Sequence, residues 1–373
     1  MLKLRRITSG ASWIPQIDGL RFVAIVAVVM FHCAGETNTR GLGPFQLGPY
    51  WAWMNQIVHW GDRGVVLFFV ISGYILARPF LRQHRLGGHE VKLRAYFLRR
   101  LTRLEPPYVI SLLIYATAEL LVLHVHLHTL VPHLLASMFY VHNLVYKQMS
   151  LINFVTWSLE IEVQFYILAP LLGTLYLIKN TVLRRGTIAL LMGVMGAISL
   201  HLGAYGSTSL LAYAHYFLAG FLLADFLEIP RHADHPTWRW DVVSIVGWWL
   251  IFSVPKGETT MAWLPFLILP VYLAAFHGKA SNWFFRQPFV ALTGGMCYSI
   301  YLMHMLIIST LFRVVKHIRL QNDGLSLAIQ TVLLLSAVLA VSTIFFVLVE
   351  RPCMDPAWPR KLWDGVRNRS SAA

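Results

Sequence analysis

Two ionisable residues in the first long apolar run, Arg21 and His32, are spaced so that they could act together. They are eleven residues apart, which on an α-helix is close to three full turns, so both lie on one face, about 16 Å apart along the axis. Considered by themselves, these two residues are explained equally well by structural roles: Arg21 could extend to the lipid headgroups, and His32 could lie at the membrane interface. A histidine in an apolar region can act as a general base or a nucleophile, which is the chemistry open to His32.

A pair of acidic residues lies where a later apolar run begins. Glu160 and Glu162 are two residues apart, about 200° around a helix, so only one can face a common cavity. Glu162 shares a face with Ser158 and Phe165, which favours it as the functional carboxylate. Glu160 is better explained as an interfacial acid stabilised by the positive end of the helix dipole.

His304 lies in the apolar run 290–312, in the outer half of the membrane, where His32 and Glu162 are also predicted to lie. We expect these three residues to meet at one depth, where a carboxylate beside a histidine can tune it as a general base. The alternative for His304 is a hydrogen-bonded histidine in the core.

The segment 82–103 carries seven Lys or Arg residues. Such a segment is first of all a topology signal or a site for anionic lipid. The functional alternative is that Arg100 and Arg103, nearest the next apolar run, bind the phosphates of a nucleotide-like donor, because a guanidinium matches a phosphate bidentately.

Two weaker signals have structural explanations by default. The first is a histidine tract that resembles a metal site: His124, His126, His128 and His133. On a helix this spacing turns the ring of His126 away from its neighbours, and no carboxylate adjoins the tract, so we predict no metal site. The second is a run of small residues, Gly61, Gly64, Ser72 and Gly73, which indicates close helix packing or, alternatively, a passage for the donor.

Transmembrane helices must position all of these residues. Of the 373 residues, 57% are hydrophobic and 13% charged, against about 25% charged residues in soluble proteins. Apolar runs long enough to cross about 30 Å of hydrocarbon recur along the chain. The sequence therefore predicts an all-α polytopic integral membrane protein of about ten transmembrane helices. The predicted spans are 17–35, 62–81, 104–127, 154–178, 185–203, 208–228, 238–255, 260–277, 290–312 and 325–349.

The distribution of positive charge predicts the orientation. With a cytoplasmic N-terminus, 22 of the 31 Lys and Arg residues lie inside and 7 outside, so both termini are predicted to be cytoplasmic. We expect a cytoplasmic segment 1–16, one transmembrane domain 17–352 and a cytoplasmic tail 353–373. Segment 134–146 is predicted to be a short outer-face or re-entrant element, although an eleventh span there would reverse everything after it.

The net charge of +14 does not indicate nucleic-acid binding, because the cations sit in short loops and form no continuous basic face. The three cysteines have no metal or redox spacing.

Six motifs in order resemble the acyltransferase 3 family, bacterial-type membrane O-acyltransferases that modify sugars of polysaccharides and other acceptors. The resemblance extends from Ile17 to Pro352. The motifs are Asp18, Gly19, Leu20 and Arg21 followed by His32; Gly61 to Gly73; Arg99, Arg100 and Arg103 with Pro106 and Tyr108; Trp157, Ser158, Leu159, Glu162, Gln164, Phe165 and Tyr166; Ser299, Tyr301, Leu302 and His304; and Glu350, Arg351 and Pro352.

The resemblance implies that His32 is the catalytic histidine, with Arg21 as its partner and Glu162 as a supporting carboxylate. It also implies an acyl-CoA donor presented from the cytoplasm, no bound cofactor, and an acceptor reached near the outer face. We expect Ser72 to line the thioester path and His304 to support the active site.

The sequence thus predicts transfer of a short acyl group, acetyl in the first instance, from acyl-CoA to a hydroxyl of a glycan, lipid-linked sugar or glycosylated small molecule. The expected location is the cytoplasmic (inner) membrane, with membrane lipids as neighbours. One alternative is a transporter that uses buried Arg, Glu and His as a substrate or proton path, although no inverted repeat is visible in the sequence. The second alternative is a structural or sensory membrane protein.

Overall fold

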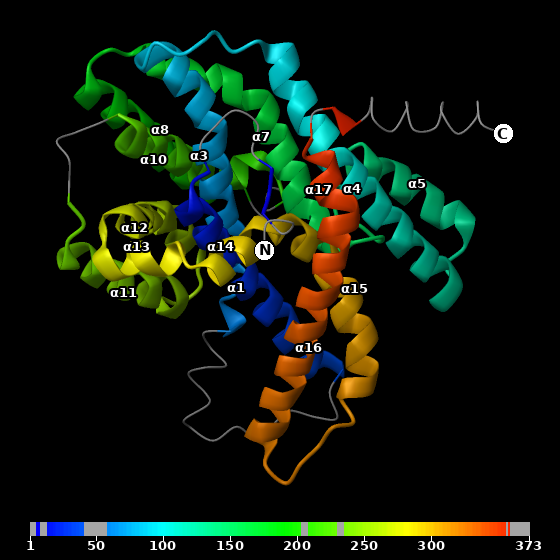
Figure 1. Cartoon of the computed structure of the whole chain (residues 1–373). Helices are drawn as coiled ribbons and strands as arrows, with labels where there is room; N and C mark the ends of the chain where they lie inside the picture. Colours follow the sequence, from blue (N-terminus) through cyan, green and yellow to red (C-terminus); the bar gives the residue numbers. More distant parts are fainter. Residues whose placement is uncertain are drawn as a thin grey trace, which may run out of the picture.

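The computed structural model describes residues 5–7, 13–40, 58–202, 208–229, 235–355 and 357–358. These ranges contain helices and no extended strand, so the all-α prediction is confirmed (Figure 1). Most of the predicted terminal segments 1–16 and 353–373 lies outside the described residues. The helices are α1 (Pro15–Arg40), α3 (Arg63–Arg85), α4 (Leu93–Val122), α5 (Leu127–Met138), α6 (His142–Tyr146), α7 (Trp157–Gly173), α8 (Thr181–Ser199), α10 (Leu210–Glu228), α11 (Trp238–Ser253), α12 (Glu258–His277), α13 (Lys279–Phe285), α14 (Pro288–Gly295), α15 (Cys297–Val315), α16 (Asp323–Phe345) and α17 (Arg351–Cys353), with short η turns between some of them.

Each of the ten predicted spans overlaps a helix, but the span predicted at 290–312 is divided at Met296 into α14 and α15. Among the described residues, eight helices are long and apolar enough to cross a membrane. The other two predicted spans correspond to α7 and α11, which have 17 and 16 residues and are near the lower limit for a spanning helix. The chain is therefore a multi-pass membrane protein.

Helix α4 begins much earlier than the prediction of a span from residue 104. It starts at Leu93 and continues through Pro106 and Pro107. A proline inside a helix leaves the carbonyl oxygen four residues before it without its N–H donor. Here the Thr102 carbonyl oxygen, freed by Pro106, accepts a hydrogen bond from Trp358 Nε1 at 2.9 Å. Pro106 and Pro107 therefore lie inside the helix, and a side chain from another segment replaces the missing backbone donor.

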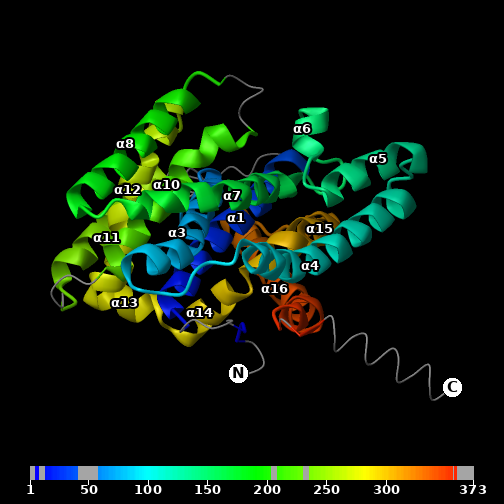
Figure 2. The ribbon, with the colours of Figure 1, turned by 90° about the horizontal axis from the view of Figure 1, so that it is seen from above.

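The segment after α4 does not cross the membrane. Helix α5 has 12 residues and α6 has 5, so even α5 is only about 18 Å long. Figure 2 shows α4 and α5 reaching away from the rest of the bundle. The segment 134–146 is therefore made of short helices, as predicted, and neither helix alone is long enough for an eleventh span.

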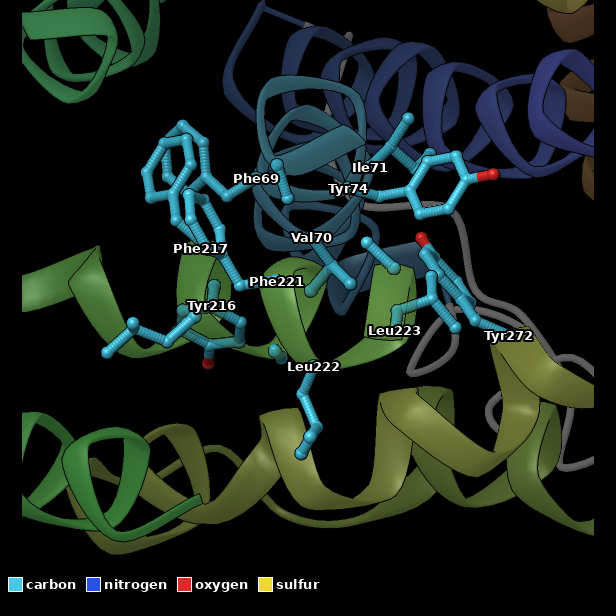
Figure 3. Close-up of a cluster of buried hydrophobic side chains, with 14 of the residues drawn as sticks. Phe69, Val70, Ile71, Tyr74, Tyr216, Phe217, Phe221, Leu222, Leu223 and Tyr272 are labelled. Atoms are coloured by element: carbon cyan, nitrogen blue, oxygen red, sulfur yellow. The ribbon is translucent and has the colours of Figure 1, made fainter. Parts of the chain in front are cut away.

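Glycines bring the central helices into close contact. A Cβ on Gly220 of α10 would lie 2.2 Å from the Val70 carbonyl oxygen, and one on Gly73 of α3 would lie 2.1 Å from the Phe217 carbonyl oxygen. Large side chains fill the space around this crossing (Figure 3). Gly61 and Gly64 meet the α1 backbone at similarly short range. Close packing, rather than a donor passage, therefore accounts for these glycines.

Candidate active site

The two histidines predicted for the active site lie side by side. His32 on α1 and His304 on α15 have ring centroids 5.1 Å apart, because these two helices pack against each other. The His32 ring also contacts Phe31 and Phe154, at 5.2 and 5.6 Å. His304 is fully buried, whereas His32 is partly exposed. His32 is therefore the member of the pair that a substrate can approach.

The hydrogen bonds of His304 determine its tautomer. Its Nδ1 lies 2.8 Å from the Tyr301 carbonyl oxygen and 3.1 Å from that of Ile300. A carbonyl oxygen only accepts, so Nδ1 must carry the proton, and a neutral His304 has its lone pair on Nε2. Within the described residues, Nε2 is buried and has no hydrogen-bond partner. Such an atom is costly to leave unbonded, so Nε2 is ready to accept a proton or a hydrogen bond.

Glu162 belongs to a different group of polar residues. Its carboxylate accepts hydrogen bonds from Ser72 Oγ and Tyr166 Oη, both at 2.7 Å. The Arg100 guanidinium lies 5.7 Å from the Tyr166 ring centroid. No contact in the described part of the chain joins Glu162 to His32 or His304. We predicted that His32, Glu162 and His304 meet. The two histidines do lie together, whereas Glu162 lies with Ser72 and near the arginines.

The two predicted donor-binding arginines, Arg100 and Arg103, differ in the contacts that their guanidinium groups already make within the protein. Both lie on α4, not in a loop. Arg100 is engaged by Tyr96, whose carbonyl oxygen accepts from Nη1 at 3.0 Å and whose ring centroid lies 3.7 Å away. Arg103 makes no hydrogen bond among the described residues, and its Nε is buried without a partner. Since Arg103 is within electrostatic range of Glu162 and Glu350, it is a partly exposed cation that is attracted to these carboxylates without bonding to them.

Arg21 is held at the opposite end of α1 from His32. Its Nη1 donates to Asp18 Oδ1 at 2.6 Å. The same carboxylate accepts from Arg6 Nη1 at 2.9 Å and from Trp13 Nε1 at 2.8 Å. The eleven-residue spacing therefore places Arg21 and His32 at two ends of one helix, and the direct partner of Arg21 is Asp18.

Three further polar contacts around the site join different helices. Glu350 accepts from Ser299 N at 3.0 Å and from Ser299 Oγ at 2.5 Å. Tyr301 Oη donates to the Val155 carbonyl oxygen at 2.5 Å and therefore accepts from Ser158 Oγ at 3.0 Å. The sequence motifs contained Glu350, Ser299, Tyr301 and Ser158, but no spacing within one helix could identify their partners on another.

Glu160 and the histidine tract have structural roles. Glu160 lies in the first turn of α7, at the positive end of the helix dipole as predicted. It is fully buried and accepts from Asn143 N at 2.9 Å, so it attaches α6 to α7. His126 stacks on His128, and His133 Nδ1 lies 2.7 Å from His142 Nε2. The described residues contain no group of three or more His, Cys, Asp or Glu side chains placed to hold a metal ion.

Comparisons with known proteins find similar sequences in several bacteria. A protein of Staphylococcus aureus (strain COL), named as a candidate O-acetyltransferase, is 28% identical over 331 residues, which are 80% of this chain and 51% of that protein. The peptidoglycan O-acetyltransferase OatA of Listeria monocytogenes is 29% identical over 180 residues, 45% of this chain and 26% of that protein. A Bacillus subtilis protein named as a candidate peptidoglycan O-acetyltransferase is 30% identical over 201 residues, 50% of this chain and 28% of its own length.

The chain spans about half the length of the S. aureus relatives it matches. No solved structure gives a significant match. A family model described as an acyltransferase domain matches residues 14–349, which include every candidate site residue considered above. The chain therefore belongs to the acyltransferase 3 family of membrane proteins.

Proposed function

We propose that this chain transfers an acetyl group from acetyl-CoA to a hydroxyl of a cell-envelope glycan or another glycosylated acceptor, in the cytoplasmic membrane. The acetyl group is supported by the printed names of the relatives, which are O-acetyltransferases. Peptidoglycan is the acceptor in two of those names and is the first acceptor to test. A CoA donor is supported by the two α4 arginines, which suit its phosphates.

The chemistry centres on His32. A ring nitrogen of His32 takes the proton of the acceptor hydroxyl, and the oxygen attacks the carbonyl carbon of the thioester. The carbon–sulfur bond breaks, the ester remains on the acceptor, and the CoA sulfur leaves and receives the proton. In the alternative route, His32 first accepts the acetyl group and then passes it to the hydroxyl. Either route converts one thioester and one alcohol into one ester and one thiol.

His304 supports this step through its free Nε2. Because Nδ1 is committed to the Tyr301 carbonyl oxygen, Nε2 can accept a hydrogen bond from the acceptor hydroxyl or from the His32 ring and so orient the reacting groups. A buried acceptor that gains its hydrogen-bond partner only when substrate is bound stabilises the bound complex. The free-energy cost of removing this acceptor from water arises on folding and is not added again on binding.

The donor would approach from the cytoplasmic end of α4. Arg103 has no hydrogen bond of its own within the described residues, so it can bind a phosphate without first breaking another contact. Arg100 is held by Tyr96 and contributes mainly positive potential. Ser72 and Glu162, hydrogen-bonded to each other, lie beside these arginines and line the proposed thioester path. Arg21, fixed by Asp18, lies at the cytoplasmic end of α1.

The observation that carries the proposal is the contact between His32 and a buried His304 whose Nε2 has no partner among the described residues. His215 also has a buried ring nitrogen without a described partner, so the contact between the two histidines is the distinguishing feature. A transporter could also place ionisable groups in the membrane, but it would need no thioester.

The test is an assay of the purified full chain in nanodiscs with acetyl-CoA labelled in the acetyl group and a peptidoglycan-derived muropeptide as the acceptor. We expect label on an acceptor oxygen and an equal amount of free CoA thiol, both dependent on the acceptor. Other hydroxyl-bearing glycans tested in parallel identify the acceptor class. A chain that moves a solute across sealed vesicles, yet releases no CoA thiol with any acceptor, would support the transporter and contradict this proposal.

A further inference from the structure

A pocket lies apart from the histidine pair, where α13 meets the residues just before α11. Its volume is about 550 Å³, and it is lined by Pro236, Lys279, Asn282, Trp283, Arg286 and Gln287. None of these residues takes part in the candidate active site. The positive-inside distribution of charge places this end of the bundle on the cytoplasmic side.

The frame of the pocket is fixed by hydrogen bonds. The Asp241 side chain of α11 accepts from the backbone N–H groups of Lys279, Ala280 and Ser281 at 2.8–3.1 Å. Thr237 N donates to the His277 carbonyl oxygen at 2.8 Å. These contacts fasten the start of α13 to the start of α11. Asp241 keeps its negative charge in these hydrogen bonds, but it is buried and is not among the residues that line the pocket.

Two cations line the pocket without an acidic partner among the described residues. Lys279 and Arg286 are both exposed, and neither forms an ion pair with any described residue. The Lys279 ammonium lies 5.7 Å from the ring centroid of Trp238. A rigid hollow with two such cations suits a singly charged phosphodiester, with the side-chain amides of Asn282 and Gln287 available as further hydrogen-bond donors.

Large apolar side chains surround these cations. Trp238 and Trp283 are 64% and 66% exposed, and Phe284 and Phe289 are 41% and 62% exposed. Exposed tryptophans are typical of the level where lipid headgroups meet the hydrocarbon. A small soluble anion would leave these rings uncovered, whereas the glycerol and upper acyl chains of a lipid would cover them. Basic pockets at the cytoplasmic ends of transmembrane helices are a known type of site for anionic headgroups.

We propose that this pocket binds one anionic phospholipid of the cytoplasmic leaflet. The phosphodiester lies between Lys279 and Arg286, and the acyl chains run along Trp283 toward the hydrocarbon. The site is independent of the acyl-transfer reaction, and its occupancy stabilises the α11–α13 corner.

The test is native mass spectrometry of the purified full chain in a neutral detergent, titrated with phosphatidylglycerol or phosphatidylcholine. Detergent removes the bilayer, so attraction to a charged membrane surface does not contribute. The variant Lys279→Gln/Arg286→Gln is compared with Lys92→Gln/Arg94→Gln, which removes one lysine and one arginine from the same side of the protein. Lys92 and Arg94 are exposed and lie outside the pocket.

We expect one phosphatidylglycerol to bind in preference to phosphatidylcholine. At about 1 kcal/mol for each cation, the pocket variant should bind it roughly thirtyfold more weakly, and the control should stay within about twofold of the parent. Equal weakening in both variants, or no preference for the anionic lipid, would overturn the proposal. Displacement of the lipid by millimolar inorganic phosphate would show a free-phosphate site instead and would also overturn it. If the double variant does not fold, Arg286→Gln alone is titrated and should show about a fivefold loss.

Discussion

The imidazole rings of His32 and His304 come from helices at opposite ends of the sequence, and their centroids are 5.1 Å apart. His304 directs a proton-bearing Nδ1 to the Tyr301 carbonyl oxygen, and its Nε2 has no hydrogen-bond partner in the part of the chain that the structure describes. The pair therefore contains one histidine with a fixed tautomer and one, His32, that is open to substrate. This asymmetry assigns the chemical step to His32 and the orienting role to His304.

The two α4 arginines should differ in donor binding. Arg103→Gln removes the cation that has no other described bond, so we expect about tenfold weaker CoA binding, from roughly 1.5 kcal/mol for a charge-assisted contact. Arg100→Gln should weaken CoA binding less but also lower thermal stability, because Arg100 packs on Tyr96. Fluorescence titration of CoA with each variant measures both affinities, and Arg99→Gln, exposed on the same helix, is the control. CoA affinities equal to that of the parent in both variants would mean that the donor binds elsewhere.

Substitution of Glu162 should affect turnover, whereas substitution of Glu160 should affect stability. Glu162→Gln weakens a carboxylate that accepts from Ser72 and Tyr166 near the arginines, so we expect turnover to fall about tenfold or more. Glu160→Gln should leave turnover within about threefold but lower the melting temperature, because it places an amide where a buried acceptor holds α6. Turnover and thermal unfolding are measured on the same preparations. A larger loss of turnover for Glu160→Gln would reverse the assignment of the two residues.

Packing of α3 on α10 should depend on glycine. Gly220→Val places a side chain where even a Cβ would lie 2.2 Å from the Val70 carbonyl oxygen, so we expect a loss of about 3 kcal/mol or more, seen as aggregation or a large fall in melting temperature. Gly186→Ala on α8 is the control, since nothing lies within 4 Å of its added Cβ, and it should be neutral or slightly stabilising. Size-exclusion profiles and thermal unfolding compare the two. A well-folded Gly220→Val protein would show that this crossing is looser than the structure indicates.

The sequence was sufficient to predict what depends on local composition and periodicity. The ten helix positions follow from apolar runs, and the packing of Gly61, Gly64 and Gly73 follows from small residues in a membrane helix. Contacts between helices were not predictable in the same way. Depth estimates grouped Glu162 with the histidines, whereas its hydrogen bond to Ser72 places it with the arginines. The carbonyl oxygen that Pro106 leaves without a donor in α4 is bonded by Trp358, which lies 256 residues away from Thr102 in the chain.

The orientation can be tested directly with introduced cysteines. His89→Cys lies between α3 and α4, and Gly257→Cys lies between α11 and α12. The positive-inside distribution predicts that an impermeant thiol reagent reaches the first only after permeabilisation and the second in intact cells. The parent, with Cys33, Cys297 and Cys353, gives the background labelling. The reverse pattern would invert the topology and move the proposed donor and lipid sites to the outer face.

The central claim is that His32 performs the chemical step, and the most direct measurement is turnover of His32→Ala in the acetyl-transfer assay. His215→Ala is the control, because it removes a histidine side chain from another membrane helix; His215 is buried, with a ring nitrogen hydrogen-bonded to the Met261 carbonyl oxygen, and it lies outside the site. We expect His32→Ala to fold and to bind CoA within a few fold of the parent, while its turnover falls at least about a hundredfold. The turnover of folded His215→Ala should stay within a few fold. Near-parental turnover by His32→Ala would contradict the assignment and require another base or nucleophile.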